Sequence, residues 1–172
     1  MRKKIFPTRS RSISGVLLLA ALSFFVVVRS GETEASKTPA AKLARSGSTW
    51  HEGAAGFREA MKEAEADGLP VAVYFYTDWC PYCRQLNTEI LAKPAVEEHF
   101  KRLVKVRINP EKGAAEREVA NQYKVSGYPT FLIHPTAKGT PVRVQGQVRE
   151  GNGWRVRTPE EFVASVRAAA GG

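Results

Sequence analysis

The sequence contains only two cysteines, and both lie within one four-residue run, as Cys80 and Cys83. With no third cysteine in the chain, neither residue can join a disulfide framework that ties distant segments together. The three histidines are scattered without ligand-pair spacing, and a structural zinc site needs four ligands. We therefore expect no metal and no cofactor other than the Cys80–Cys83 pair, a dithiol that can open and close.

Acidic residues are absent from residues 1–30, which contain six basic ones. The whole chain has a formal net charge of +9, but without these six it has 20 Lys and Arg against 17 Asp and Glu. The rest of the chain is thus close to neutral and has no basic stripe. We expect no nucleic-acid partner.

An apolar run over residues 13–28 follows the basic head. A membrane-spanning helix usually needs about 20 apolar residues, so this shorter run is typical of a signal peptide. No clean cleavage site follows, so membrane anchoring through residues 13–28 stays an alternative. No cysteine stands directly after the run, which excludes a lipid-anchored mature N-terminus. We expect residues 1–30 to be a signal peptide or an N-terminal membrane anchor, and the protein to be periplasmic or otherwise extracytoplasmic.

Residues 31–49 are rich in Ser, Thr, Ala, Pro and Lys and should form a flexible linker. Residues 50–172 should form one domain. Its apolar pattern predicts the order α-β-α-β-α-β-β-α, with a capping signature at Thr158 opening the last helix. The predicted helices are 54–67, 80–92 with a further helical piece over 94–100, 113–123 and one from 158. The predicted strands are 71–76, 103–108, 130–134 and 141–148.

Two segments of this domain invite more specific predictions. Apolar and basic residues alternate over 103–108, which predicts a strand with one face in solvent. Residues 146–157 contain three glycines beside several charges, which we interpret as a mobile insertion before the last helix.

Cys80 lies between an apolar strand and a predicted helix. Unpaired backbone N–H groups and the positive end of the helix dipole favour a thiolate there. A pKa lowered from about 8.5 to about 6.5 corresponds to about 2.7 kcal/mol and makes thiolate the main form at neutral pH. We expect Cys80 to be the attacking sulfur and Cys83, one turn further and less exposed, to resolve the mixed disulfide.

A purely structural disulfide is the main alternative for this motif. A four-residue ring removes little entropy from the unfolded chain, about 2 kcal/mol against about 4.7 kcal/mol for a 100-residue loop. Redox exchange is therefore the favoured interpretation.

Tyr128-Pro129 precedes the predicted strand 130–134. Such a dipeptide is usually a trans turn, but beside a CxxC motif we expect a cis bond that sets the Tyr128 backbone next to Cys80 as a docking edge for an extended substrate. Trp79 is expected to pack in the core or to form a rim of that groove. Tyr82 is expected to be exposed and to modulate Cys80.

The run Trp79-Cys80-x-x-Cys83 and the later Gly127-Tyr128-Pro129-Thr130 resemble the thioredoxin superfamily. Among its members, the chain is most similar to exported thioredoxin-like proteins related to the C-terminal domain of DsbD. The resemblance implies an α/β fold, thioredoxin-like, with a central mixed β-sheet flanked by helices. It also implies Cys80 as the nucleophile, Cys83 as the resolving cysteine and Pro129 as the cis proline.

The sequence departs from the family pattern at two places. Thioredoxins carry a buried Asp six residues before the first cysteine, where this chain has Tyr74, so either Asp78 or Glu89 replaces that acid or resolution is slower. The dipeptide between the cysteines is Pro-Tyr, as in glutaredoxins. The strand 130–134 is not followed by the Gly-Gly that binds glutathione in glutaredoxins, so glutathione use is disfavoured.

These features predict an exported thiol–disulfide oxidoreductase acting on protein thiols and disulfides. The favoured direction is reduction, with electrons from a membrane donor of the DsbD or CcdA type, because the chain lacks the long helical insertion of DsbA-type oxidases. One alternative is a disulfide oxidase of the same fold. Another is a non-catalytic thioredoxin-like module that binds peptides in the groove beside Pro129.

Overall fold

The computed structural model describes residues 49–172. The predicted signal or anchor segment, residues 1–30, and nearly all of the predicted linker, residues 31–49, lie outside the described residues. Within residues 49–172, none of the helices has the length and hydropathy that crossing a membrane requires.

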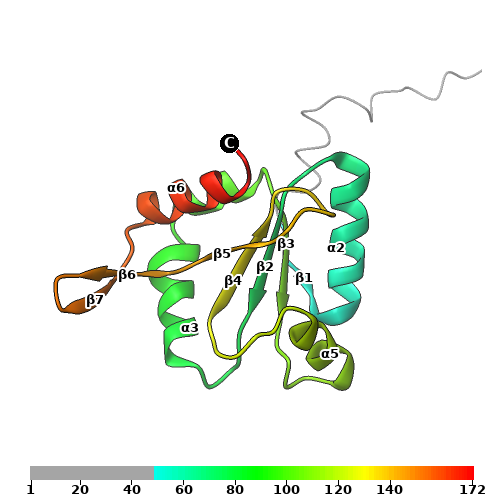
Figure 1. Ribbon diagram of the computed structural model, residues 1–172, viewed down its shortest axis with the longest axis horizontal. Helices are drawn as coiled ribbons and strands as arrows, with labels where there is room; N and C mark the ends of the chain where they lie inside the picture. Colours follow the sequence, from blue (N-terminus) through cyan, green and yellow to red (C-terminus); the bar gives the residue numbers. More distant parts are fainter. Residues whose placement is uncertain (1–48) are drawn as a thin grey trace, which may run out of the picture. The chain divides into compact units, whose positions relative to one another are not determined.

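Five strands form one sheet in the order β1–β3–β2–β4–β5 (Figure 1). Strand β3 pairs in parallel with both β1 and β2, whereas β4 is antiparallel to β2 and to β5. The sheet is therefore mixed, and the predicted fold class is confirmed. The strands are β1 (His51–Glu52), β2 (Val71–Phe75), β3 (Val104–Ile108), β4 (Thr130–His134) and β5 (Val142–Val144).

Helices cover both faces of this sheet, with α2 and α5 on one face and α3, α4 and α6 on the other (Figure 1). The helix predicted over 80–92 is not continuous: after α3 the chain forms a π-helix, η1, in which the Ala92 N–H donates to the Asn87 carbonyl at 2.9 Å. The helices are α2 (Gly53–Asp67), α3 (Pro81–Leu86), η1 (Asn87–Leu91), α4 (Pro94–Phe100), α5 (Ala114–Gln122) and α6 (Pro159–Ala169).

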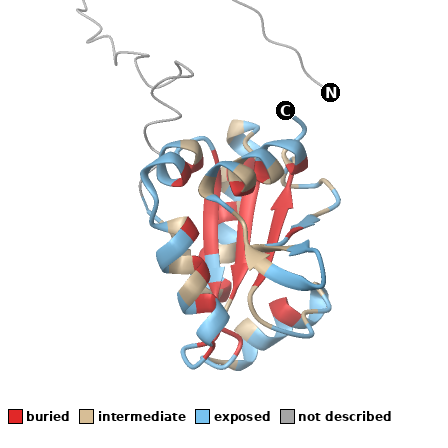
Figure 2. Cartoon of the chain, turned by 90° about the vertical axis from the view of Figure 1, so that its left-hand side faces the viewer, coloured by how far each residue is buried: buried red, intermediate tan, exposed pale blue. Residues whose placement is uncertain are grey.

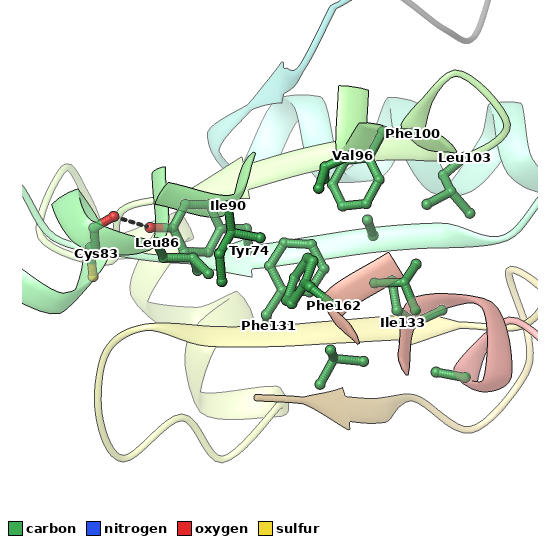
Figure 3. Packing of buried hydrophobic residues seen from close by; sticks show 14 of the residues in the cluster. Tyr74, Cys83, Leu86, Ile90, Val96, Phe100, Leu103, Phe131, Ile133 and Phe162 are labelled. Carbon is green, nitrogen blue, oxygen red and sulfur yellow. Dashed lines mark hydrogen bonds between the residues drawn. The ribbon is translucent and has the colours of Figure 1, made fainter. Parts of the chain in front are cut away.

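Strand β2 lies at the centre of the sheet and is buried along its whole length (Figure 2). Because successive side chains of a strand point to opposite faces, β2 supplies both halves of the core. Val73 and Phe75 pack in the half under α2 and α5, whereas Tyr74 packs with Phe131 and Phe162 in the half under α3, α4 and α6 (Figure 3). The end of β2 is thereby fixed from both sides.

Strand β3 differs from the prediction of one face in solvent, because Lys105 is only 5% exposed. The cause is Trp50, which packs against Phe100 of α4 and covers this part of the strand. The Lys105 ammonium lies 5.9 Å from the centre of the Trp50 ring, close enough for a cation–π contact. Burial lowers the pKa of Lys105. Of the two basic residues in β3, only Arg107 is exposed.

Residues 146–157, interpreted from the sequence as a mobile insertion, form a regular antiparallel hairpin instead. Its strands are β6 (Gln147–Glu150) and β7 (Gly153–Val156), which form a separate two-stranded sheet. The loop between them has two residues, and the first, Gly151, has a φ of +57°. A glycine at this position suits the tight turns that join short hairpins. The strand predicted over 141–148 is correspondingly shorter and ends at Val144.

Charged side chains tie this hairpin to the start of α6. The Arg155 guanidinium donates to both carboxylate oxygens of Glu161 at 2.7 Å and to Glu150 at 2.9 Å. Glu161 also closes the predicted capping box with Thr158, which is confirmed. The Arg157 N–H donates to the Gly146 carbonyl at 2.9 Å and closes the base of the hairpin.

Candidate active site

The two cysteines lie where β2 ends and α3 begins. Cys80 is the N-cap of α3, and its Sγ accepts a hydrogen bond from the Cys83 N–H at 3.1 Å. Pro81 occupies the first helical position, where the missing N–H has no helical acceptor to lose. The two sulfurs form a disulfide, with the Cα atoms 5.2 Å apart. Cys80 thus lies at the start of a helix, as the sequence predicted, and a backbone N–H donates to its sulfur.

Both cysteines are buried in this oxidised form. Cys80 is 2% exposed and Cys83 is 1% exposed, so the expected difference in their exposure is not present in the disulfide state. The side chains that border the pair are the exposed ones: Trp79 is 62% exposed and Tyr82 is 58% exposed. Exposed aromatic side chains thus stand on both sides of the buried Cys80 in the chain, at positions 79 and 82.

Tyr74 fills the position of the family's buried Asp and contacts the resolving cysteine through the backbone. Its hydroxyl donates to the Cys83 carbonyl at 3.4 Å (Figure 3). The ring stacks on Tyr76 at 5.5 Å between centroids and packs against Phe131. Burial raises the pKa of Tyr74, with a further contribution from Tyr76. Tyr74 is thus a neutral hydrogen-bond donor and does not act as a proton acceptor.

Neither acid proposed to replace that Asp lies in the buried interior. The Asp78 carboxylate is exposed and pairs with the Lys112 ammonium at 2.7 Å, and the Lys112 hydrogen bond lowers the Asp78 pKa. Glu89 is exposed and accepts from the Gln85 amide at 3.2 Å. Each of these carboxylates has a partner other than Cys83.

Trp79 lies outside the core, at the rim of the predicted groove beside Pro129. Its indole N–H donates to the Glu111 carboxylate at 3.0 Å. Its ring meets Tyr128 edge to face, with centroids 6.4 Å apart. The bond between Tyr128 and Pro129 is cis. The rim therefore joins the dithiol turn to the loop that precedes β4.

A cavity of about 330 Å³ adjoins this rim. Tyr82, Tyr128 and Pro129 line it on the side of the dithiol, so three of the predicted site residues share one cavity. Trp154 and Val156 of β7 line it on the other side. These two were not predicted as site residues. The sequence pattern that could have identified them is a glycine at a two-residue turn, followed by alternating apolar residues at 154 and 156, which is typical of a hairpin.

Within residues 49–172, no group of three His, Cys, Asp or Glu side chains comes together as metal ligands would. The chemistry that these residues offer is that of the two sulfurs. The disulfide can accept two electrons, and the dithiol can donate them.

Comparison with known proteins agrees with this arrangement. Residues 57–153, more than half of the chain, match the thioredoxin-like domain family. The chain belongs to the thioredoxin-like family. It is related to DsbD proteins, and it carries the Cys80–Cys83 disulfide within the matched residues.

Individual relatives of this thioredoxin-like protein include the thiol:disulfide interchange protein DsbD of Ralstonia nicotianae, 30% identical over 115 residues. That match covers 66% of this chain but only 17% of the Ralstonia protein. A thioredoxin from Thermus thermophilus is 30% identical with a TM-score of 0.52, covering 70% of this chain and 87% of that one.

The oxidised DsbD C-terminal domain of Neisseria meningitidis gives a TM-score of 0.57 at 18% identity, covering 70% of this chain and 99% of that one. At this identity the likeness concerns the fold alone.

Proposed function

We propose that the protein is an exported thiol–disulfide oxidoreductase that reduces disulfides in other proteins. The observation that carries the proposal is the position of Cys80: its sulfur caps α3, accepts the Cys83 N–H at 3.1 Å and is bonded to Cys83. Tyr128, which packs against the exposed ring of Trp79, and Pro129, which lines the cavity, frame an approach for an extended partner segment.

In the reaction, the Cys80 thiolate attacks one sulfur of the partner's disulfide. A bond forms between that sulfur and Cys80, and the partner's other sulfur leaves as a thiolate that takes a proton from water. The Cys83 thiol then loses its proton and attacks Cys80, which releases the partner's second thiol. Two electrons pass to the partner, and the Cys80–Cys83 disulfide is formed.

Within residues 49–172 no buried carboxylate is available to remove the proton from Cys83, and Tyr74 occupies the family's position for one as a hydrogen-bond donor. In this proposal solvent takes the proton, so resolution is the slower of the two attacks. A membrane protein of the DsbD or CcdA type would return the electrons to Cys80–Cys83. The basic head and apolar run of residues 1–28 support export.

The reducing direction is supported by the short connection between β3 and β4, which contains a single helix of nine residues, α5. The test is the reduction potential of Cys80–Cys83 measured in glutathione buffers. A value well below the roughly −120 mV of DsbA supports a reductase, and a value near it makes the protein an oxidase.

Insulin reduction by the wild type and by Cys80→Ser completes the test. Turnover by the wild type alone supports the enzyme. If both proteins are equally inert while a peptide still binds beside Pro129, the protein is a binding module.

A further inference from the structure

Large apolar side chains are exposed at four positions within residues 49–172: Trp79, Tyr82, Val142 and Trp154. The three aromatic ones gather on one surface, since Tyr82 and Trp154 line the same cavity and Trp79 packs against Tyr128, which lines it too. Scattered exposed apolar residues are ordinary, but a contiguous group marks a place where another molecule binds. Val142 stands apart from the lining of this cavity.

The cavity is apolar at its base, and its lining includes Tyr82, which lies between the two cysteines in the chain. Leu86 and Ile90, both buried, form its lining on the side of α3 and η1, with Phe131 of β4. Pro129 belongs both to this lining and to the loop that meets Trp79 through Tyr128. A segment that reaches Cys80 along that loop therefore passes the mouth of the cavity.

The charge in this lining has one sign. Arg143 is its only charged residue, and three glutamines supply the other polar side chains. One guanidinium nitrogen of Arg143 donates to the Thr130 hydroxyl at 3.1 Å, while the side chain as a whole remains exposed. The remaining N–H groups of Arg143 favour a carboxylate nearby and disfavour an ammonium.

We propose that this cavity is a substrate subsite that receives a large apolar side chain next to the reacting disulfide, in an extended partner segment with acidic and not basic neighbours. Trp154 is its specificity-determining residue. The inference rests on the proposed function, because the segment is placed by its reaction at Cys80. It adds the class of partner sequence that the dithiol selects.

The hairpin presents Trp154 from a strand that is held in place. Arg155, the next residue, is fixed by two carboxylates, and Val156 packs against the core cluster. At the base of the hairpin, a Cβ added to Gly146 would lie 2.8 Å from Leu86 Cδ1, so the chain passes directly over α3. A ring held this way is available for contact without the entropy cost of ordering a loop.

The test uses the full chain, reduced with dithiothreitol and then freed of it. The probes are seven-residue peptides whose central cysteine forms a mixed disulfide with thionitrobenzoate. Attack of Cys80 on the peptide sulfur releases the coloured thionitrobenzoate anion, and attack of Cys83 then releases the peptide thiol. One peptide has alanine at all flanking positions, and the others have phenylalanine at one flanking position in turn, beside either glutamate or lysine.

We expect at least one phenylalanine peptide with glutamate to react about tenfold faster than the alanine peptide, and faster than its lysine counterpart. Trp154→Ala should remove the preference for phenylalanine over alanine, and Val142→Ala, which shortens another exposed apolar side chain outside the cavity, should keep it. Dithiobis(nitrobenzoate), which has no flanking residues, should react equally with all three proteins.

Equal rates for all the peptides, or a preference that survives Trp154→Ala, would overturn the inference. So would the same loss in Val142→Ala as in Trp154→Ala. If the wild type fails to react even with dithiobis(nitrobenzoate), the proposed function itself is wrong, which is a different result from loss of the preference alone.

Discussion

The two walls of the cavity beside Cys80 are built from different interactions. The wall formed by α3 is held by backbone hydrogen bonds, by the disulfide and by burial of Leu86 in the core. The hairpin wall is held by the Arg155 ion pairs and by close contact at Gly146. In the proposed reaction, the first wall must hold the Cys80 sulfur in place. The proposed selection of a partner segment by the second wall depends on ion pairs, which low pH and high salt can weaken.

The largest expected effect concerns the first wall and separates attack from resolution. Cys83→Ser leaves Cys80 able to attack but removes the sulfur that releases the partner. We expect mixed disulfides to accumulate on Cys80 and turnover of insulin to fall at least about a hundredfold. Gel electrophoresis without reductant detects the adducts. Cys80→Ser is the control, and adducts of equal yield on that variant would contradict the assignment of Cys80 as nucleophile.

A smaller but still large effect is expected where the two walls meet. Gly146→Ala places a Cβ 2.8 Å from Leu86 Cδ1, so the Leu86 side chain, the hairpin base or α3 must shift. We expect the free energy of unfolding to fall by about 1–3 kcal/mol. Urea denaturation measures it. Gly127→Ala is the matched control, because nothing lies within 4 Å of its added Cβ, and an equal loss in both variants would argue against a contact specific to Gly146.

Tyr74→Phe examines the buried support of the first wall. It removes the hydroxyl that donates to the Cys83 carbonyl and leaves the ring packing intact. We expect a loss of about 1 kcal/mol in the free energy of unfolding and little change in the rate of attack by Cys80. Tyr76→Phe removes a hydroxyl from the neighbouring stacked ring and should cost less. A marked fall in the attack rate would instead place Tyr74 in the chemistry of Cys80.

The smallest effect concerns the second wall and depends on pH. The Arg155 hydrogen bonds lower the pKa of Glu161 to about 2, below its ordinary value of 4.5. A lowered folded-state pKa means that the stabilisation is complete above about pH 5 and is lost as the pH falls towards 2. The difference in urea midpoint between the wild type and Glu161→Gln should shrink over that interval, and also in high salt.

Glutamine can still cap the helix at residue 161, so this comparison isolates the ion pair. Glu160→Gln in the same helical turn is the control and should show no such pH dependence. A Glu161→Gln difference that stays constant from pH 7 to pH 2.5 would contradict the role of the pair.

The first wall was predictable from the residues themselves, whereas the mixed sheet was predicted from the resemblance to the thioredoxin superfamily. Two cysteines after a buried strand and before a helix have few structural interpretations, and the cap at Thr158 follows from local backbone chemistry. These features depend on residues close together in the chain, where spacing alone determines the geometry.

The second wall was missed for the opposite reason. The glycines and charges of residues 146–157 are typical of a flexible loop until Arg155 is seen to meet Glu161 and Gly151 to form a two-residue turn. Lys105 was misplaced similarly, because an alternating pattern does not reveal that Trp50, 55 residues earlier, covers it. Contacts between distant segments decide both cases.

The π-helix after α3 has a consequence for alignment and for engineering. A π-turn holds one residue more than the α-helical turn that it replaces. Aligning this chain with a relative that has an uninterrupted α-helix at this place therefore requires a gap within Asn87–Leu91. A variant shortened by one residue there should regain regular winding, and the side chains from Ala92 onward should keep their orientation relative to the sulfur pair.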